Sequence, residues 1–214
     1  MSRASRGRNG GFTIVEVMVF SVVSLVLIGL LASLFIMATR RTEDSRLRVD
    51  LQQTALFALK KIETELSRSS IRSIAASDGD YYIVSTTGVV GWDGAPDIIW
   101  SEQQTAFVFN PAKKTLHYEV VEKDASELSE ELTRFRPYLP TSAELQAIAG
   151  NSSGAERVLS THVEGFKLTD RSGNSTQFQS MPLKLELKFR RPLSTSDRHA
   201  EFTIERRYTL RNTF

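Results

Sequence analysis

Residues 8–17 read Arg-Asn-Gly-Gly-Phe-Thr-Ile-Val-Glu-Val, and they join a short basic leader to a long apolar run. Within residues 12–38 the only ionisable side chain is Glu16. A helix needs roughly 20 apolar residues to cross a bilayer, so this run predicts a membrane-embedded helix. A removable secretory signal has a shorter apolar core of about 7–15 residues, followed by small residues at the cleavage site. Here the small residues Gly10 and Gly11 precede the core, so a cut beside them would leave the helix on the mature protein.

The carboxylate of Glu16 is unusual in this setting, because a charged side chain at the bilayer centre costs about 2.5–3.5 kcal/mol. If the cut falls after Gly11, the new α-amino group of Phe12 supplies a cation, since the pKa of such a group is about 7.7–8.0. Within one helix Glu16 lies one turn from that amine. Across two packed helices it could neutralise the amine of a neighbour, and the carboxylate would then join subunits.

The motif Gly-Phe-Thr-Ile-Val-Glu at residues 11–16 resembles the type III signal of type IV pilins and of the pseudopilins of type II secretion. The resemblance implies that a prepilin peptidase removes residues 1–11 by cutting between Gly11 and Phe12, that Phe12 is N-methylated, and that Glu16 guides subunit docking. It also implies a single-pass protein of the bacterial inner membrane, with a cytoplasmic N-terminus and a periplasmic C-terminal domain, which enters a filament after assembly. The implied partners are other minor and major pilin-like subunits, the prepilin peptidase and the inner-membrane assembly platform.

Two questions stay open from the residues themselves. A signal-anchor helix with an incidental Gly-Gly and an interfacial, snorkelling Glu16 is the alternative to a cleaved pilin-type signal; such a chain would be an uncleaved periplasmic binding protein. Arginines flank the apolar run on both sides, so charge alone does not set its orientation. Many major pilins also carry a proline in the middle of this helix, whereas residues 12–70 contain none, which leaves local melting of the helix on assembly open.

Past Arg40 and Arg41 the apolar pattern continues on one side only. Apolar residues at every third or fourth position predict an amphipathic helix. We therefore expect one continuous helix, with a transmembrane half at residues 12–39 and an amphipathic half at residues 40–70. The amphipathic half needs a cover, which we expect the C-terminal domain to supply; a free coiled coil is the alternative. Its apolar stripe consists of Leu47, Leu51, Ala55, Leu59, Ile62 and Leu66.

Beyond about residue 77 the apolar residues recur at every second position, which predicts strands. Residues 110–114 predict a hairpin connection and residues 171–175 a turn. Short helices are expected at residues 125–135 and 142–148, and the second begins with a capping box of Thr141 and Glu144. The expected strands are residues 81–85, 98–100, 106–109, 116–121, 156–159, 163–169, 183–189 and 202–210.

These elements predict an α+β, pilin-like fold, in which the long N-terminal helix packs against a largely antiparallel, β-rich globular domain at residues 71–214. The strand pattern around residues 163–166, 182–187 and 206–211 resembles the larger minor subunits, namely the J-type minor pseudopilin of type II secretion and the PilW-type minor pilins. The resemblance implies a minor pseudopilin at the tip or in the initiation complex of a periplasmic pseudopilus. A minor type IV pilin for pilus assembly, adhesion, motility or DNA uptake is the alternative.

The composition bounds the remaining function classes. The chain has 214 residues, and the part beyond the leader and the membrane span is long enough for one globular domain of ordinary size. The formal net charge of +2 would fall to −1 when the three arginines of the leader are lost, so net charge gives no support for polyanion binding. Cysteine is absent, which excludes disulfides, thiolate metal sites and a cysteine nucleophile.

No residue pattern indicates an enzyme, a metal or a cofactor. His117, His162 and His199 are scattered over expected strands and loops, without the pairing that a metal site needs. Residues 78–80 and 93–97 contain aspartates that could supply oxygen ligands to calcium. Asp-Gly is first of all a turn signal, however, and neither segment fits the spacing of an EF-hand loop. We expect no cofactor, and calcium is the alternative.

Arginines gather towards the end of the chain. A basic surface of this kind suits contacts to nucleic acid phosphates. We expect instead that these arginines pair with Glu186, Glu201 and Glu205 on a solvated sheet face, so nucleic acid is not an expected partner. The arginines are Arg190, Arg191, Arg198, Arg206, Arg207 and Arg211.

Overall fold

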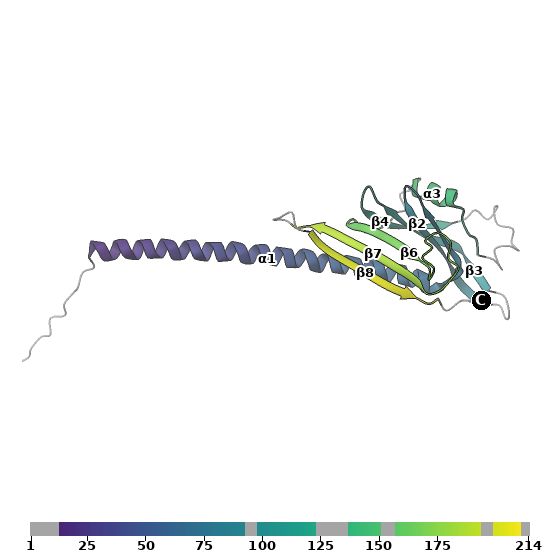
Figure 1. Cartoon of the computed structure of the whole chain (residues 1–214), viewed down its shortest axis with the longest axis horizontal. Coiled ribbons are helices and arrows are strands. Elements are labelled where there is room, and N and C mark those ends of the chain that lie inside the picture. Colours follow the sequence, from purple (N-terminus) through teal and green to yellow (C-terminus); the bar gives the residue numbers. More distant parts are fainter. Residues whose placement is uncertain (1–12, 93–97, 123–136, 151–156, 194–198, 211–214) are drawn as a thin grey trace, which may run out of the picture. The chain divides into compact units, whose positions relative to one another are not determined.

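The structure is a computed structural model, and it describes residues 13–92, 98–122, 137–150, 157–193 and 199–210 (Figure 1). The expected helix at residues 125–135 lies outside these residues. The chain forms two compact units, Met1–Ser45 and Arg46–Phe214. The fold class is α+β, as predicted, with one long N-terminal helix followed by antiparallel sheets.

Helix α1 (Ile14–Arg68) has 55 residues and confirms the continuous helix that the sequence predicts. Serines end it. Ser69 Oγ donates to the carbonyl of Glu65 at 2.7 Å, and Ser70 N–H donates to Ser73 Oγ at 3.0 Å. Serine side chains that bond to nearby backbone groups compete with helical hydrogen bonds. The chain therefore leaves the helix at Ser69 and enters a strand without a loop.

The apolar stripe in the second half of α1 is buried, as the spacing predicts. Five of its six residues are less than 5% exposed, while Leu47 is half-buried at the rim. The stripe packs against apolar side chains from both sheets of the second unit, which form one core with it. The predicted cover is thus the β-rich part of the chain. The five buried residues are Leu51, Ala55, Leu59, Ile62 and Leu66.

The first sheet, sheet A, has five antiparallel strands in the order β1-β2-β3-β4-β5. The predicted hairpin connection between β3 and β4 is present, and the amide of Lys113 donates to Asn110 Oδ1 at 2.9 Å. The bounds are β1 Ser69–Asp78, β2 Tyr82–Trp92, β3 Ile98–Asn110, β4 Thr115–Glu122 and β5 Arg157–Ser160.

Three features of sheet A differ from the sequence prediction. Strand β2 continues to Trp92, beyond the predicted strand at residues 81–85. The sequence does not predict strand β1, because its serines and alanines have weak strand propensity; pairing with β2 over residues 74–78 makes it a strand. Strand β3 joins two runs that the sequence predicts as separate strands. The polar residues 101–105 between these runs interrupt the apolar alternation. Pairing with β2 on one side and β4 on the other nevertheless keeps them in one continuous strand.

The second sheet, sheet B, has three antiparallel strands in the order β6-β7-β8. Their bounds are β6 Val163–Thr169, β7 Leu183–Pro192 and β8 His199–Tyr208. Residues Leu183, Leu185, Leu187 and Phe189 of β7 are buried, whereas the charged residues between them are more exposed. The strict alternation in this strand therefore predicts its buried face correctly.

Helix α3 (Ser142–Gly150) covers the face of sheet A that does not face the stripe of α1 (Figure 1). Its buried residues Leu145 and Ala149 pack against Ile83, Ala106 and Val108. The predicted capping box is present. Thr141 N–H donates to Glu144 Oε2 at 2.7 Å, and Glu144 N–H donates to Thr141 Oγ1 at 3.3 Å.

Two tyrosines tie the layers of the second unit together. The hydroxyl of Tyr82 on β2 accepts from Leu168 N–H at 3.1 Å and lies within donating distance of the carbonyls of Leu168 and Ser175, at 2.9 and 3.0 Å. Burial raises the pKa of Tyr82, so the hydroxyl stays protonated. Tyr208 on β8 donates to Glu63 Oε1 of α1 at 2.9 Å. Sheet B is thereby hydrogen-bonded to sheet A through one tyrosine and to α1 through the other.

We predict that Tyr82→Phe lowers the free energy of unfolding of the second unit by about 1–3 kcal/mol, because the amide of Leu168 loses its acceptor at a buried site. Chemical denaturation followed by tryptophan fluorescence measures the change. Tyr81→Phe is the matched control, since the Tyr81 hydroxyl has no hydrogen-bond partner among the described residues. Equal effects of the two substitutions would show that the Tyr82 hydroxyl does not join the sheets.

Candidate functional site: an exposed apolar helix with one carboxylate

The structure describes one of the three predicted site residues. Gly11 and Phe12 lie outside the described residues, so the cleavage and methylation positions stay predictions. Glu16 lies in the first turn of α1 and is exposed. It is the only acidic residue in that turn.

Glu16 closes a capping box with Thr13. Thr13 N–H donates to Glu16 Oε2 at 2.9 Å, the Thr13 hydroxyl donates to the same oxygen at 3.0 Å, and Glu16 N–H donates to Thr13 Oγ1 at 3.3 Å. The first amides of a helix have no partner within it, so this arrangement satisfies two of them. A carboxylate there also favours the positive end of the helix dipole. The Thr-x-x-Glu spacing at residues 13–16 is a sufficient signal for this cap, as the same spacing is at residues 141–144.

The cap leaves part of the carboxylate available. Both hydrogen bonds to Glu16 end on Oε2, and within the described part of the chain Oε1 accepts none. A carboxylate has about four lone-pair sites, so a second cation or donor fits on the same group. Helix capping and a contact to a neighbouring subunit are therefore compatible roles.

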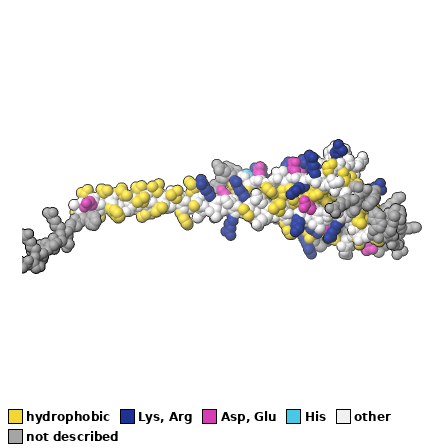
Figure 2. All heavy atoms as spheres, turned by 90° about the horizontal axis from the view of Figure 1, so that it is seen from below, with side chains coloured by type: hydrophobic (Ala, Val, Ile, Leu, Met, Phe, Trp, Pro, Cys, Tyr) yellow, Lys and Arg dark blue, Asp and Glu magenta, His cyan; other side chains and the backbone are white. Residues whose placement is uncertain are grey.

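The first unit has a large apolar surface that is exposed within the described residues. Among the described residues α1 is the one helix long and apolar enough to cross a membrane, by length and composition, and none of its apolar window is buried inside the protein. Its large hydrophobic side chains from Ile14 to Met37 are all at least 50% exposed. Figure 2 shows them covering the first part of the helix. An apolar surface of this extent needs lipid or other helices around it, so this segment could be a membrane anchor or a signal sequence.

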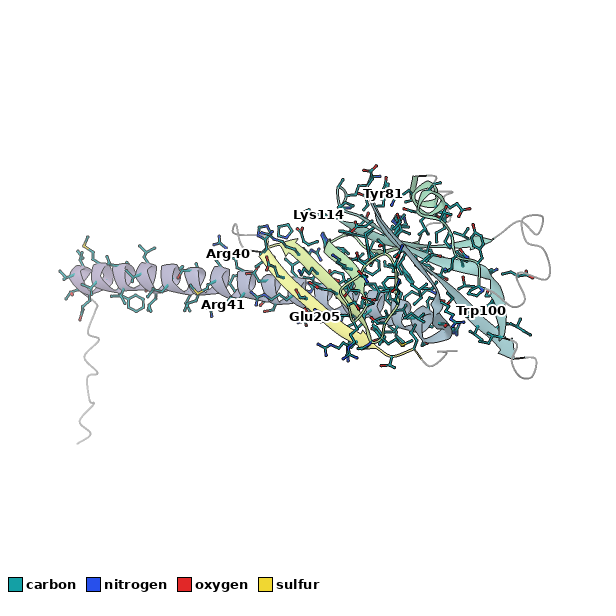
Figure 3. All side chains as sticks on the ribbon, turned by 45° about the vertical axis from the view of Figure 1, so that its right-hand side comes forward. Arg40, Arg41, Tyr81, Trp100, Lys114 and Glu205 are labelled. Atoms are coloured by element: carbon teal, nitrogen blue, oxygen red, sulfur yellow. The ribbon has the colours of Figure 1, made fainter. Side chains whose placement is uncertain are left out.

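The charged residues Arg40 and Arg41 end this apolar segment (Figure 3). Both are exposed. Long cationic side chains can extend from a helix toward a polar interface while their stems stay on apolar surface. The apolar segment therefore begins at a capped, acidic turn and ends at a pair of cations.

The described candidate metal residues of the second unit lie on separate elements. His117 lies on β4, His162 precedes β6, and His199 begins β8. Burial, with a smaller contribution from the nearby Arg191, lowers the pKa of His162. The aspartates of residues 78–80 are exposed at the turn between β1 and β2, and residues 93–97 lie outside the described residues. No group of three or more His, Asp or Glu side chains that could hold a metal ion is present among the residues that the structure describes.

Sheet B carries a ladder of opposite charges on its solvated face. As expected, Arg190 pairs with Glu201, at 3.4 Å. Glu186 and Glu205 pair with lysines instead of arginines: Lys188 lies 2.6 Å from Glu186, and Lys184 lies 3.0 Å from Glu205. The hydrogen bond from Lys188 lowers the pKa of Glu186. Arg191 pairs with Asp50 of α1 rather than with sheet B.

Asp170 organises the loop between β6 and β7. Its carboxylate is buried and accepts hydrogen bonds from four donors in the loop. Burial would raise the pKa of Asp170, but these hydrogen bonds outweigh burial and lower it. The predicted turn at residues 171–175 is present, with Gly173 at a φ of 87°. The donors are the amides of Ser172, Asn174 and Gln179, at 2.9, 2.9 and 3.3 Å, and the Ser180 hydroxyl at 3.1 Å.

We predict that Asp170→Asn destabilises the second unit at neutral pH, because the amide nitrogen of asparagine cannot accept from these donors. The folded-state pKa of Asp170 is lowered, so its stabilisation is present above the unfolded pKa of about 3.9 and is lost as the pH falls through the folded-state pKa. The difference in unfolding free energy between the original chain and the variant should therefore shrink in acid, as denaturation at several pH values would show. Asp80→Asn, at an exposed aspartate, is the control. A difference that does not change with pH would contradict this role.

The described elements define a class of architecture. A long N-terminal helix with an apolar first half, followed by antiparallel sheets, is consistent with a pilin-like architecture. Comparison with protein-family models, curated proteins and solved structures found no match. The pilin-like likeness therefore concerns the shape of the fold.

Proposed function

We propose that the protein is a minor pilin-like subunit, specifically a minor pseudopilin that acts at the tip or in the initiation complex of a periplasmic type II secretion pseudopilus. The observation that carries this proposal is the difference between the two halves of α1. The second half is buried under the sheets, whereas the first half exposes its apolar side chains around one acidic turn. Exposing such an apolar surface to water would be unfavourable for a soluble protein. A filament subunit that is held in the membrane before assembly, in contrast, requires an apolar helix of this kind.

Both environments of such a subunit would cover the exposed half. Lipid would surround the apolar segment before assembly, and the helices of other subunits would surround it afterwards. The subunit would be a single-pass protein of the inner membrane, with the β-rich domain in the periplasm. The proposed partners are other minor and major pilin-like subunits, the prepilin peptidase and the inner-membrane assembly platform.

Glu16 would act twice in this scheme. In the isolated chain it caps α1 through Oε2. In the filament its carboxylate would also neutralise the methylated amine of Phe12 on a neighbouring subunit. An unpaired buried charge is strongly unfavourable, which would make the pairing a condition for docking.

The proposed role is structural rather than catalytic. The exported substrate would be moved by the whole machine, and the subunit would contribute helix packing and a globular surface. The pilin-like shape is equally compatible with a minor subunit of a type IV pilus. Genes for a secretion channel beside this one would favour the pseudopilus, and genes for pilus assembly or competence would favour the pilus.

We predict that co-expression with an active prepilin peptidase yields a species that lacks residues 1–11 and begins with N-methylated Phe12. Intact-mass analysis measures both changes at once. Expression without the peptidase is the control and should yield the uncut chain. An uncut chain in the presence of the peptidase would point to a signal anchor, and a cut after the apolar segment would point to a secretory signal; either result would contradict the proposal.

Substitutions in the first turn of α1 can distinguish the helix-capping role of Glu16 from its proposed docking role. Glu16→Gln keeps a capping box, because glutamine also serves at this position, but it removes the charge. We predict about a tenfold or greater loss of Glu16→Gln subunit recovered with its filament partners, since a buried amine then stays unpaired at a cost of about 3–5 kcal/mol. Thr13→Val removes the capping hydroxyl and keeps the carboxylate, so it should be recovered almost normally.

Quantitative pull-down from membranes, normalised to the amount of processed subunit, measures this recovery. The opposite order of defects, with Thr13→Val impaired and Glu16→Gln normal, would show that Glu16 acts through the cap alone.

A further inference from the structure

A groove of about 630 Å³ runs along strand β1 in the second unit. Its floor includes the consecutive residues 74–78 of β1. Residues 176–179 of the loop between β6 and β7 form one side, and Leu139, Pro140 and Ser142 at the start of α3 form the other. No part of the proposed filament function accounts for this groove.

The groove follows the edge of the strand rather than one of its faces. Successive side chains of a strand point to opposite faces, so a cavity on one face meets alternate residues. This groove meets every residue from Ile74 to Asp78. Strand β1 is also the terminal strand of sheet A, with β2 as its one strand neighbour in the described part of the chain.

The backbone of this edge is unpaired on its outer side. Within the described residues, no hydrogen bond joins the backbone of residues 74–78 to a segment other than β2. An edge strand with free N–H and C=O groups is a template for the addition of another strand.

Hydrogen bonds fix both walls of the groove. The Ser142 hydroxyl lies 2.7 Å from the hydroxyl of Ser77 on β1, which holds the start of α3 beside the strand. On the other side, Gln179 N–H donates to Asp170 Oδ2 at 3.3 Å, so the buried aspartate holds the loop in place. The groove is therefore formed by the fold before any segment enters it.

The charges of the groove lie at its two ends. Arg72 and Asp78 are its only ionisable lining residues, and both are exposed. Neither forms an ion pair with another described residue. The rest of the lining is apolar or uncharged, with Ile71, Ile74, Leu139 and Phe178 as its large apolar side chains.

We propose that this groove binds an extended segment of a partner polypeptide as a sixth strand of sheet A, antiparallel to β1. In this direction the C-terminal end of the segment lies beside Arg72 and its N-terminal end beside Asp78. The charge order therefore selects a segment with a cation at its N-terminal end and a carboxylate at its C-terminal end. Residues 72–78 span at most about 20 Å at 3.4 Å per residue. This length suits a segment of up to about seven residues, including the two charged ones, with small or β-branched side chains between them.

The walls favour a free segment over a second copy of this chain. If the β1 edges of two copies paired antiparallel, Arg72 of each copy would lie beside Asp78 of the other, so the charges would also match. However, each edge lies between a loop and a helix start, and the walls of both copies would meet before the recessed strands came within the roughly 4.8 Å of a paired sheet. The proposal does not depend on the filament role, because it concerns the second unit alone.

Two labelled peptides of opposite charge order test the proposal with the full chain in detergent micelles. The forward peptide is acetyl-Lys-Thr-Val-Thr-Val-Thr-Glu, and the reversed peptide is acetyl-Glu-Thr-Val-Thr-Val-Thr-Lys. Both have an amidated C-terminus, so they have the same composition and the same net charge. Fluorescence anisotropy should show at least about tenfold tighter binding of the forward peptide. In the double variant Arg72→Glu, Asp78→Lys this preference should invert. The control double variant Glu102→Lys, Lys113→Glu changes exposed charges outside the groove and should keep it.

Hydrogen exchange on the unmodified chain tests the binding mode without any substitution. The forward peptide should slow exchange of amides within residues 74–78, because backbone pairing protects the edge. Absence of binding, equal binding of both peptides, a preference that survives the charge exchange, or protection outside β1 would each overturn the proposal. Concentration-dependent dimers of the chain alone, with the same amides protected, would identify a second copy as the occupant and would also overturn it.

Discussion

Burial of the apolar stripe of α1 is the interaction on which the rest of the second unit depends. The backbone hydrogen bonds of a helix are internal, so they cannot join the helix to either sheet. Side-chain packing has to attach α1 to sheet A and sheet B. Leu51, Leu59, Ile62 and Leu66 supply that packing, and each large side chain removed from water contributes about 1.5–3 kcal/mol. Sheet A and sheet B share one core through this helix, and the hydroxyls of Tyr82 and Tyr208 fix how they meet it.

The two halves of α1 differ in burial: the apolar stripe of the second half is buried, whereas the apolar side chains of the first half are exposed. Helical periodicity alone does not distinguish them, because both are helical and the residues between them do not break the helix. The difference lies in the composition of the opposite side. Charged residues line that side in the second half, whereas Glu16 is the one charged residue of the first half and large apolar side chains lie on every side of it. A helix with large apolar side chains on every side has no charged side to turn toward water. Within the described residues nothing covers this half, and Glu16 is its one charged group.

Much of this fold is predictable from local patterns, and the exceptions share a cause. The helix, the alternation in β7 and the cap at Thr141 all follow from periods or spacings within a few residues. Strand β1 and the polar middle of β3 depend on pairing with distant segments, which overrides weak propensity. Sequence reasoning also misses Asp170, because its four donors give no signal beyond an ordinary turn. The cap at Thr13 does have a sufficient local signal, the Thr-x-x-Glu spacing of residues 13–16. The apolar run that follows makes pairing of the Glu16 charge the more obvious explanation for the same residue.

The unpredicted strand β1 bears directly on function. A strand with strong propensity and a flat apolar edge would pair with any other edge, including its own copy, and soluble proteins protect such edges. Here weak propensity, a register shift after Ser69 and two walls fixed by hydrogen bonds keep the edge from pairing freely. The backbone groups of residues 74–78 nevertheless stay unpaired on their outer side within the described residues. An edge that is recessed rather than covered excludes folded sheets by shape and admits a single extended chain. Selectivity then comes from the charges at its ends, because backbone hydrogen bonds are the same for every sequence.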